Sequence, residues 1–522
     1  MSRQARIPAQ VHQHTPCERY SRLPQVGSRG DATGAPLARY ALRCGWCVRA
    51  LGVTRAQMSM PSMPADPWPR VAANLTFYMY TDPSLDHGWM RNCKGFDALL
   101  RGVRFQNLAE VSLRSVMHAH PRRVDDPAKA DLFYLPLYPY VSGALKNCSL
   151  PPGAPSAPPF KLLSSHEARM AVAKATLEVS PYFRRRLGRD HLWATTTWST
   201  LSTSFAKRMR PLGFALYCTI VGRYKPFCRE LCERKHTRLS SLGACVIHIP
   251  YVANPMATRA YRPGRQRTVL LSFAGSFDVC CSGAQIRCKL GDLMEATVSS
   301  LDVQIRPSLP AMSSNRSAAQ MGPCTARAVA AVSKARDAAP QTPAGRQLGA
   351  SALRESVVTE DAIEADGQLM SRSVFCLAPA GDNCVSGRFY SAIAAGCIPV
   401  VICGSSVEKH PVAYERSLPY GKFWIQVSKA EWIRSPVAVL ARLRRMPKSE
   451  VEAYQAAIAR HRADVLYDVP ESRVGSNLLG AIAHRCLSPD ALAKFNAGKV
   501  HGCSSNSTYF SSLDRSQGRE PA

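Results

Sequence analysis

The stretch FCLAPAGDNCVSGRFYSAIAAGCIPVVI, residues 375–402, decides the fold. A short apolar strand ends at Pro379, and turn-forming residues follow it. Ser386 can cap a helix that starts at about Gly387, Gly396 can end it, and CIPVVI (397–402) is the next strand. A crossover of this length predicts a βαβ unit with parallel strands. Ligands of such units bind at the C-terminal ends of the strands, beside the helix N-termini.

Arg388 stands in the first turn of this predicted helix, where the positive helix end disfavours a cation. A bound anion would reverse that preference, because the helix N–H groups and the guanidinium could then hold the same diphosphate. Alternatively, Arg388 extends to solvent or pairs with Asp382. The residues by themselves leave both interpretations open.

Length and charge limit the class of protein. The chain has 522 residues, 46% of them hydrophobic, which suffices for two or three globular domains. A count of 67 Lys and Arg against 37 Asp and Glu gives a formal charge of +30, which favours anionic partners. No RNA-binding signature is found, so no nucleic-acid partner is expected. The absence of GxxxxGK[ST] and GxSxG motifs speaks against a phosphate-loop NTPase and an α/β-hydrolase.

Composition divides the chain into four parts. Residues 1–70 are rich in Pro, Gly, Arg and Ser and predict a disordered leader. Strands alternate with helices in 71–265 and again in 266–470, which predicts two parallel α/β domains. An Ala-, Pro- and Ser-rich tract at about 303–350 predicts a disordered insertion in the second domain, and 471–522 a C-terminal tail. Other predicted strands lie in 75–80, 130–140, 188–198, 245–252 and 268–278, and predicted helices in 108–120, 166–186, 286–300 and 435–466.

Cysteines and glycosylation motifs point to the secretory pathway. The 19 cysteines lack the spacing of a zinc site, so disulfides and buried thiols are both open interpretations. N-x-S/T triplets occur at Asn74, Asn147, Asn315 and Asn506. The chain contains no run of roughly 18 apolar residues, so the sequence predicts no membrane span.

The motifs of residues 375–402 resemble those of the exostosin-like glycosyltransferases, glycosyltransferase family 47. CLAPAGD, SGRFYSAI and GCIPVVI match its C-L-x-P-x-G-D, S-x-R and G-C-I-P-V elements. Further family-like elements follow the family's order: DPAKADLFYLPLY (126–138), GRDHLW (188–193), LLSFAGS (270–276) and AYERSLPYGKFWIQV (413–427). In the last of these, Ala413 replaces a proline of the family. The resemblance covers roughly residues 73 to 470.

The resemblance implies a GT-B fold, with two Rossmann-like domains facing a cleft. The nucleotide sugar would bind the C-terminal domain and a glycan, polysaccharide or glycoprotein acceptor mainly the N-terminal one. It implies an inverting, metal-independent transfer from a UDP-sugar, with no cofactor, and no DxD motif is found. It also implies residence in the Golgi lumen with type II membrane topology. Membrane association, or a homo- or hetero-oligomer with related transferases, is expected in addition. The alternative is a basic polyanion- or RNA-binding protein on a catalytically degenerate scaffold.

The resemblance also implies the roles of individual residues. Eight residues are expected to bind the nucleotide sugar at the diphosphate, at the ribose or along the cleft: Gly381, Asp382, Ser386 and Arg388, then Glu415, then Ser272, Phe273 and Gly275. Asp190 and His191 are the leading pair for the base that an inverting transfer requires. The alternative for His191 is a structural histidine of the core.

Overall fold

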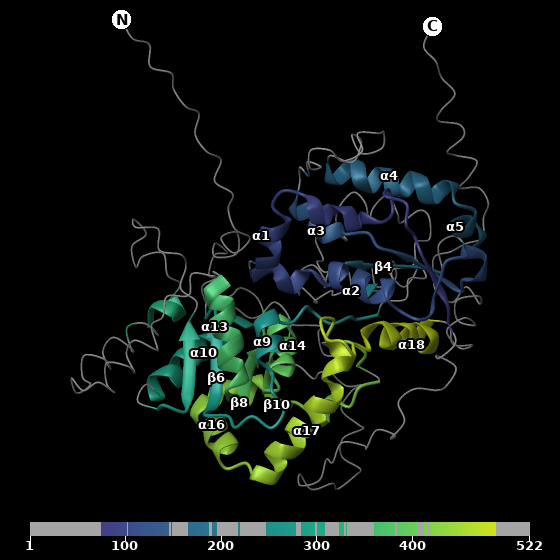
Figure 1. Cartoon of the computed structure of the whole chain (residues 1–522). Helices are drawn as coiled ribbons and strands as arrows, with labels where there is room; N and C mark the ends of the chain where they lie inside the picture. Colours follow the sequence, from purple (N-terminus) through teal and green to yellow (C-terminus); the bar gives the residue numbers. More distant parts are fainter. Residues whose placement is uncertain are drawn as a thin grey trace, which may run out of the picture. The chain divides into compact units, whose positions relative to one another are not determined.

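The chain folds into a mixed α/β structure with two parallel sheets (Figure 1). The computed structural model describes residues 75–101, 103–145, 148, 165–186, 190–195, 218–219, 247–277, 283–297, 300–307, 323–327, 330, 360–381, 384–403, 412–415 and 417–486. The predicted leader, most of the predicted insertion and the end of the predicted tail lie outside these residues.

The first sheet has the strand order β2-β1-β3-β4-β5. Its strands are β1 (Phe77–Met79), β2 (Arg123–Val124), β3 (Leu132–Leu135), β4 (His191–Thr195) and β5 (Cys218–Thr219). Neighbouring strands run parallel throughout. The second strand lies on one side of β1 and the third on the other, so the chain changes direction between β1 and β3. Such a switch point leaves a crevice at the C-terminal ends of the strands.

The helices of this half are mostly short. They are η3 (His87–Asn92), α1 (Phe96–Arg101), η4 (Val103–Asn107), α2 (Ala109–His118), η5 (Pro127–Lys129), α3 (Pro139–Ala144), α4 (His166–Val179) and α5 (Pro181–Arg186). The single helix predicted over 166–186 is therefore two helices. Pro181 explains the break, because it lacks an N–H and disfavours a helical conformation of the residue before it.

The second sheet repeats the order of the first, read from its other edge: β10-β9-β8-β6-β7. Its strands are β6 (Val269–Gly275), β7 (Val303–Pro307), β8 (Ser373–Pro379), β9 (Ile398–Cys403) and β10 (Ile425–Ser428), all in parallel pairs. Every residue of β9 is buried, as the continuous apolar run predicts for an inner parallel strand. The switch point lies between β6 and β8.

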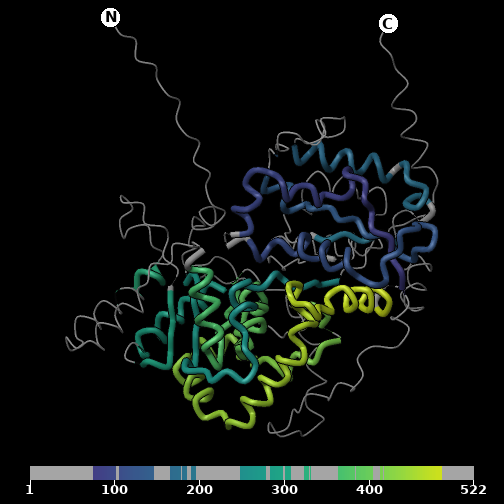
Figure 2. Tube along the Cα trace, viewed as in Figure 1, coloured from purple at the N-terminus to yellow at the C-terminus, as the bar shows by residue number. Residues whose placement is uncertain are grey.

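Helices surround this second sheet, drawn in teal to yellow in Figure 2. They are α9 (Pro255–Ala260), α10 (Ala284–Ala296), α13 (Glu360–Ser371), α14 (Gly387–Ala394), η11 (Tyr420–Lys422), α15 (Lys429–Arg434), α16 (Pro436–Arg444), α17 (Lys448–Val465) and α18 (Val474–Cys486). The long helix predicted over 435–466 is wrong in detail, since the chain breaks at Met446 and Pro447 between α16 and α17.

Three further expectations are corrected by the structure. Residues 303–307, assigned to the disordered insertion, form β7, because the sequence VQIRP pairs with β6 over its whole length. Residues 245–252 do not form a strand in the described part, where Ile247 makes only an isolated bridge. Residues 474–486, assigned to the tail, form α18, since Val474, Leu478 and Ile482 are buried at helical spacing.

Four disulfides lie within the described residues: Cys93–Cys148, Cys288–Cys324, Cys376–Cys397 and Cys384–Cys403. The last two enclose the β8–α14–β9 unit. Several cysteines that lie close together in the sequence are outside the described part: Cys44 and Cys47, Cys228 and Cys232, and Cys280 and Cys281. Within that part, no helix is both long and apolar enough to cross a membrane.

Candidate functional site

The candidate site lies where β6 and β8 end side by side. β6 ends at Gly275 and β8 at Pro379, and the two strands are direct neighbours in the sheet. α10 follows β6 and α14 follows β8, so two helices begin at the same edge of the sheet (Figure 1). Helix N-termini present free N–H groups and a partial positive charge, and this edge therefore favours an anion.

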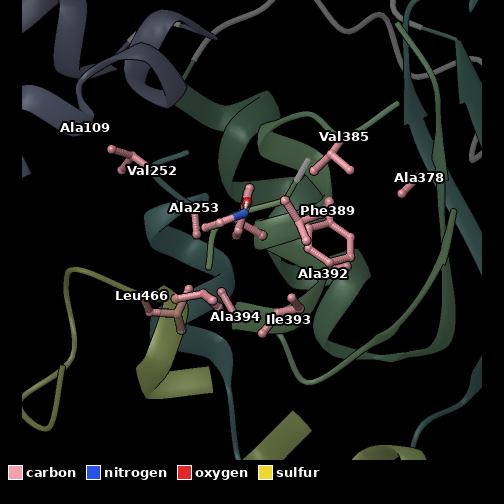
Figure 3. Packing of buried hydrophobic residues seen from close by; sticks show 14 of the residues in the cluster. Ala109, Val252, Ala253, Ala378, Val385, Phe389, Ala392, Ile393, Ala394 and Leu466 are labelled. Atoms are coloured by element: carbon pink, nitrogen blue, oxygen red, sulfur yellow. Dashed lines mark hydrogen bonds between the residues drawn. The ribbon is translucent and has the colours of Figure 1, made fainter. Parts of the chain in front are cut away.

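Buried hydrophobic side chains hold α14 in place next to this edge of the sheet. Figure 3 shows Phe389, Ala392 and Ile393 of α14 packed among buried side chains that include Val252 and Leu466. Gly396 ends the helix with φ +69°, the left-handed conformation predicted for it. Ser386 occupies the N-cap position, but its side chain makes no capping hydrogen bond, so that part of the expectation is wrong. The N-terminal N–H groups of α14 are thus not capped by Ser386.

Arg388 turns towards β6. Its guanidinium carbon lies 4.8 Å from the centroid of the Phe273 ring, a cation–π contact. Gly275 makes room for it: a Cβ there would lie 2.7 Å from Nη2 of Arg388 and 3.0 Å from the Phe273 ring. The structure therefore brings together three residues that the sequence analysis assigned to the nucleotide-sugar site. Arg388 is 18% exposed, so it does not extend freely into solvent.

Asp366 of α13 is the charged neighbour of Arg388. Nη1 of Arg388 lies 3.5 Å from Oδ2 of Asp366, whereas Asp382, the partner considered from the sequence, lies outside the described residues. Burial raises the pKa of Asp366, and the nearby Arg388 and Arg306 oppose that rise. Nη1 of Arg388 and Oδ1 of Asp366 are buried without a hydrogen bond in the described part. The pair thus retains unused hydrogen-bonding capacity at this edge of the sheet.

Arg287, in the first turn of α10, is a site residue that the sequence analysis missed. It donates from Nε to the carbonyl of Ala380 and from Nη1 to the carbonyl of Ser276, each at 3.0 Å. It thereby joins the loops that follow β6 and β8. A Cβ on Gly381 would lie 3.1 Å from its Nη2, so Gly381 lies against this arginine. The rule that drew attention to Arg388, a cation in the first turn of a helix after a strand, would also have found Arg287.

Glu415 lies in a turn between β9 and β10. Tyr390 of α14 holds the turn, residues 413–415, in place, because its hydroxyl accepts a hydrogen bond from the Ala413 N–H at 3.1 Å. Because Tyr390 is two residues beyond Arg388, one helix positions both the arginine and the turn. Glu415 is partly exposed, as a ligand-binding carboxylate must be.

Ser272 differs from its predicted companions. It is buried within β6, and its hydroxyl lies 3.6 Å from Sγ of Cys376. Phe273 and Gly275 contact Arg388, while the only polar contact described for the Ser272 side chain is with the sulfur.

Asp190 and His191, the predicted base pair, lie in the first sheet. Nδ1 of His191 is 2.8 Å from Oδ1 of Asp190, and its Nε2 is 2.9 Å from the Tyr80 hydroxyl. The imidazole is fully buried and stacks on Phe133 with a centroid distance of 4.8 Å. Because a carboxylate only accepts, the proton of the neutral ring lies on Nδ1 and Nε2 accepts from Tyr80. These contacts also suit the alternative of a structural core histidine.

The described residues contain no cluster of three or more His, Cys, Asp or Glu side chains suited to hold a metal ion. The charged groups around Arg388 are Arg287, Arg306 and Asp366, so that with Arg388 itself three cations lie near one carboxylate. Such a surplus of arginine beside two helix starts can bind a diphosphate through charge-assisted hydrogen bonds.

Comparison with known proteins identifies a matching protein family and several similar structures. The model of the exostosin GT47 domain matches residues 72–443. No curated protein matches the chain. Among solved structures, α,α-trehalose 6-phosphate synthase from Burkholderia multivorans is similar at a TM-score of 0.36 and 11% identity, over 64% of this chain and 77% of that one. The N-terminal domain of Candida albicans trehalose-6-phosphate phosphatase gives 0.34 and 9%, over 62% and 73%, and an apo structure of OtsA gives 0.35 and 11%, over 65% and 78%.

Proposed function

Because the chain belongs to the exostosin GT47 family and is a glycosyltransferase, we propose that it transfers a sugar from a UDP-sugar to a glycan or polysaccharide acceptor with inversion. Its two parallel Rossmann-like sheets fit the GT-B fold of such enzymes. The proposal places the nucleotide sugar at the β6–β8 edge. No finding supports the alternative of a polyanion- or RNA-binding protein.

The observation that carries the proposal is the setting of Arg388. Its guanidinium lies over Phe273, beside Gly275 and at the start of α14, within the switch point where α/β sheets bind their ligands. A UDP diphosphate there would gain hydrogen bonds from Arg388 and from N–H groups of α14. These groups would stabilise the charge that develops on the leaving UDP. Gly381, Asp382 and Ser386 would complete the loop around it.

Glu415 would bind the other end of the nucleotide. An ionised carboxylate accepts hydrogen bonds from the two ribose hydroxyls. We propose that the cationic groups supply the charge neutralisation that a metal supplies in other transferases, so that neither a metal nor a cofactor is required.

For the base, Asp190 and His191 remain our candidates. His191 would have to release the Tyr80 hydroxyl from Nε2 before it could accept a proton from the acceptor. Asp190 would keep the ring oriented through Nδ1 during that exchange.

The Golgi lumen is the proposed location, with the type II topology and the association with membranes or related transferases known for the family. The four disulfides among the described residues support an oxidising compartment.

The decisive experiment measures UDP binding and UDP release against a panel of UDP-sugars for wild type and Arg388→Ala. We expect the variant to lose affinity and turnover by about 100-fold, the usual effect of removing one charge-stabilising group. Arg442→Ala is the matched control, because Arg442 forms an exposed ion pair with Glu431 away from the site. Unchanged UDP binding by Arg388→Ala would show that the site is wrongly placed, whereas failure of wild type with every donor would disprove the donor class.

A further inference from the structure

Tyr414 adopts an unusual backbone conformation directly before Glu415. Its φ is +52°, and among the described residues it alone combines a positive φ with a side chain. The left-handed region is unfavourable for residues with a Cβ, and Tyr lacks the short polar side chain that eases it for Asn and Asp. Such conformations persist only where the surroundings enforce them, and they concentrate at functional sites.

Three segments of the chain enforce this conformation. The Tyr414 N–H donates to the carbonyl of His248 at 3.3 Å, and the hydroxyl donates to the carbonyl of Val474 at 3.0 Å. Its own carbonyl accepts from the N–H groups of Ser417 and Leu418 at 2.8 and 3.2 Å. Because Tyr414 is almost fully buried, these bonds are shielded from water.

Two more buried tyrosines fix the preceding residue. Tyr390 accepts from the Ala413 N–H at 3.1 Å, and the hydroxyl of Tyr420 donates to the Ala413 carbonyl at 2.6 Å. Both peptide groups that flank Ala413 are thereby held, while Glu415 itself stays partly exposed. Since Tyr390 belongs to the helix that carries Arg388, the turn and the arginine share one support.

We propose that Tyr414 is a positioning residue for the donor: its left-handed conformation directs the Glu415 carboxylate towards the ribose, in register with Arg388. A residue with ordinary φ at this position would rotate the next Cα–Cβ bond and turn Glu415 elsewhere. The inference rests on the proposed function, because it assumes that Glu415 binds the ribose of a UDP-sugar.

The test compares Tyr414→Phe with Tyr467→Phe. Tyr467 is a matched control, since its hydroxyl is also buried and donates to a backbone carbonyl, that of Pro250, at 2.9 Å. Both variants lose one such bond and should lower Tm similarly. Only Tyr414→Phe should raise the donor KM, by about fivefold for one lost hydrogen bond, with kcat nearly unchanged. Tyr414→Gly, which tolerates the positive φ but loses the hydroxyl bond and the ring packing, should raise the KM further.

A second readout addresses the ribose directly. The affinity difference between UDP and 2′-deoxy-UDP should shrink in Tyr414→Phe, because a misdirected Glu415 no longer distinguishes the two ligands. If Tyr414→Phe loses Tm like the control but keeps the donor KM and the 2′-hydroxyl discrimination, Tyr414 only stabilises the fold and the inference is wrong. Glu415→Ala and Arg388→Ala, measured in parallel, separate that result from a failure of the proposed site, since they lose donor binding whenever the site is right.

Discussion

The two halves of the chain share one sheet topology, but they differ in the side chains that lie near its switch point. Each sheet has a switch point between its first and third strands, and in each half an arginine lies near the start of a helix between the third and fourth strands. In the second half this is Arg388, which is partly exposed and whose Nη1 makes no hydrogen bond in the described part. In the first half it is Arg169, which is fully buried and donates to Ser142 Oγ and to the carbonyls of Ser142 and Leu145.

The first half fills its crevice with its own polar groups. Glu110 of α2 is fully buried and accepts hydrogen bonds from the N–H groups of Tyr140 and Val141 at the start of α3, at 3.2 and 2.8 Å. Burial raises its pKa well above the usual value, and the two N–H groups oppose the rise. The helix start that could have bound an anion is thus occupied by a side chain. The same topology occurs twice, and the side chains decide at which switch point hydrogen-bonding capacity stays unused.

The largest expected effect comes from closing the open crevice. In Gly275→Ala, the added Cβ would meet Nη2 of Arg388 at 2.7 Å and the Phe273 ring at 3.0 Å, and the φ of +158° at this position disfavours a side chain. We expect donor-dependent activity to fall about 100-fold, or roughly 2.7 kcal/mol, together with a lower Tm. Steady-state kinetics and thermal unfolding measure the two effects.

Gly143→Ala is the matched control in the first half. Gly143 lies in α3, and a Cβ there meets nothing within 4 Å. Activity should be retained and Tm should rise slightly, because alanine is the better helix former. Equal losses of activity in the two variants would contradict the contrast between the halves.

The second prediction concerns pH and the first half. Burial lowers the pKa of His87 to about 3, and the charge of Arg169 adds to this effect. His87 is therefore neutral in the folded protein, while in the unfolded chain it takes up a proton below about pH 6.5. The contribution of neutral His87 to the free energy of unfolding is complete above pH 6.5 and is lost as the pH falls towards 3. The free energy of unfolding should therefore decrease by about 2 kcal/mol between pH 6.5 and 5. Denaturant unfolding at several pH values should show a shallower decline in His87→Gln. Parallel declines would show that His87 is protonated in the folded state.

Sequence periodicity predicted most of the sheet framework for a physical reason. Inner parallel strands such as β8 and β9 need continuous apolar runs, and α14 needs turn residues at both ends. The resemblance to the family assigned Phe273, Gly275 and Arg388 to one site, and the sheet accounts for their proximity, because the C-terminal ends of parallel strands meet at one edge. Asp366 was missed because α13 follows a tract without periodicity, so no helix was predicted there.

Other features depend on contacts that no local pattern encodes. The left-handed Tyr414 follows from hydrogen bonds to His248 and Val474, distant in sequence. The burial of Arg169 likewise depends on Ser142 of α3, which supplies two oxygen acceptors. A sequence shows an arginine near a helix start in both halves, and only tertiary packing separates a structural arginine from one that is available to a ligand.

The smallest expected effect comes from Asp366, the carboxylate beside the open crevice. As an anion it attracts Arg388 and repels a diphosphate, whereas the Phe273 ring holds the arginine without any such charge. Asp366→Asn keeps the size of the side chain and removes the repulsion, so UDP should bind about threefold tighter, a modest effect because a partly exposed charge is screened by water. Uridine, which lacks the diphosphate, should bind both proteins equally. Since burial raises the pKa of Asp366, the affinity of wild type for UDP should approach that of the variant as pH falls. Weaker binding by Asp366→Asn, measured by titration calorimetry, would mean that the carboxylate is needed to hold Arg388 in place, and the second half would then depend on an internal ion pair.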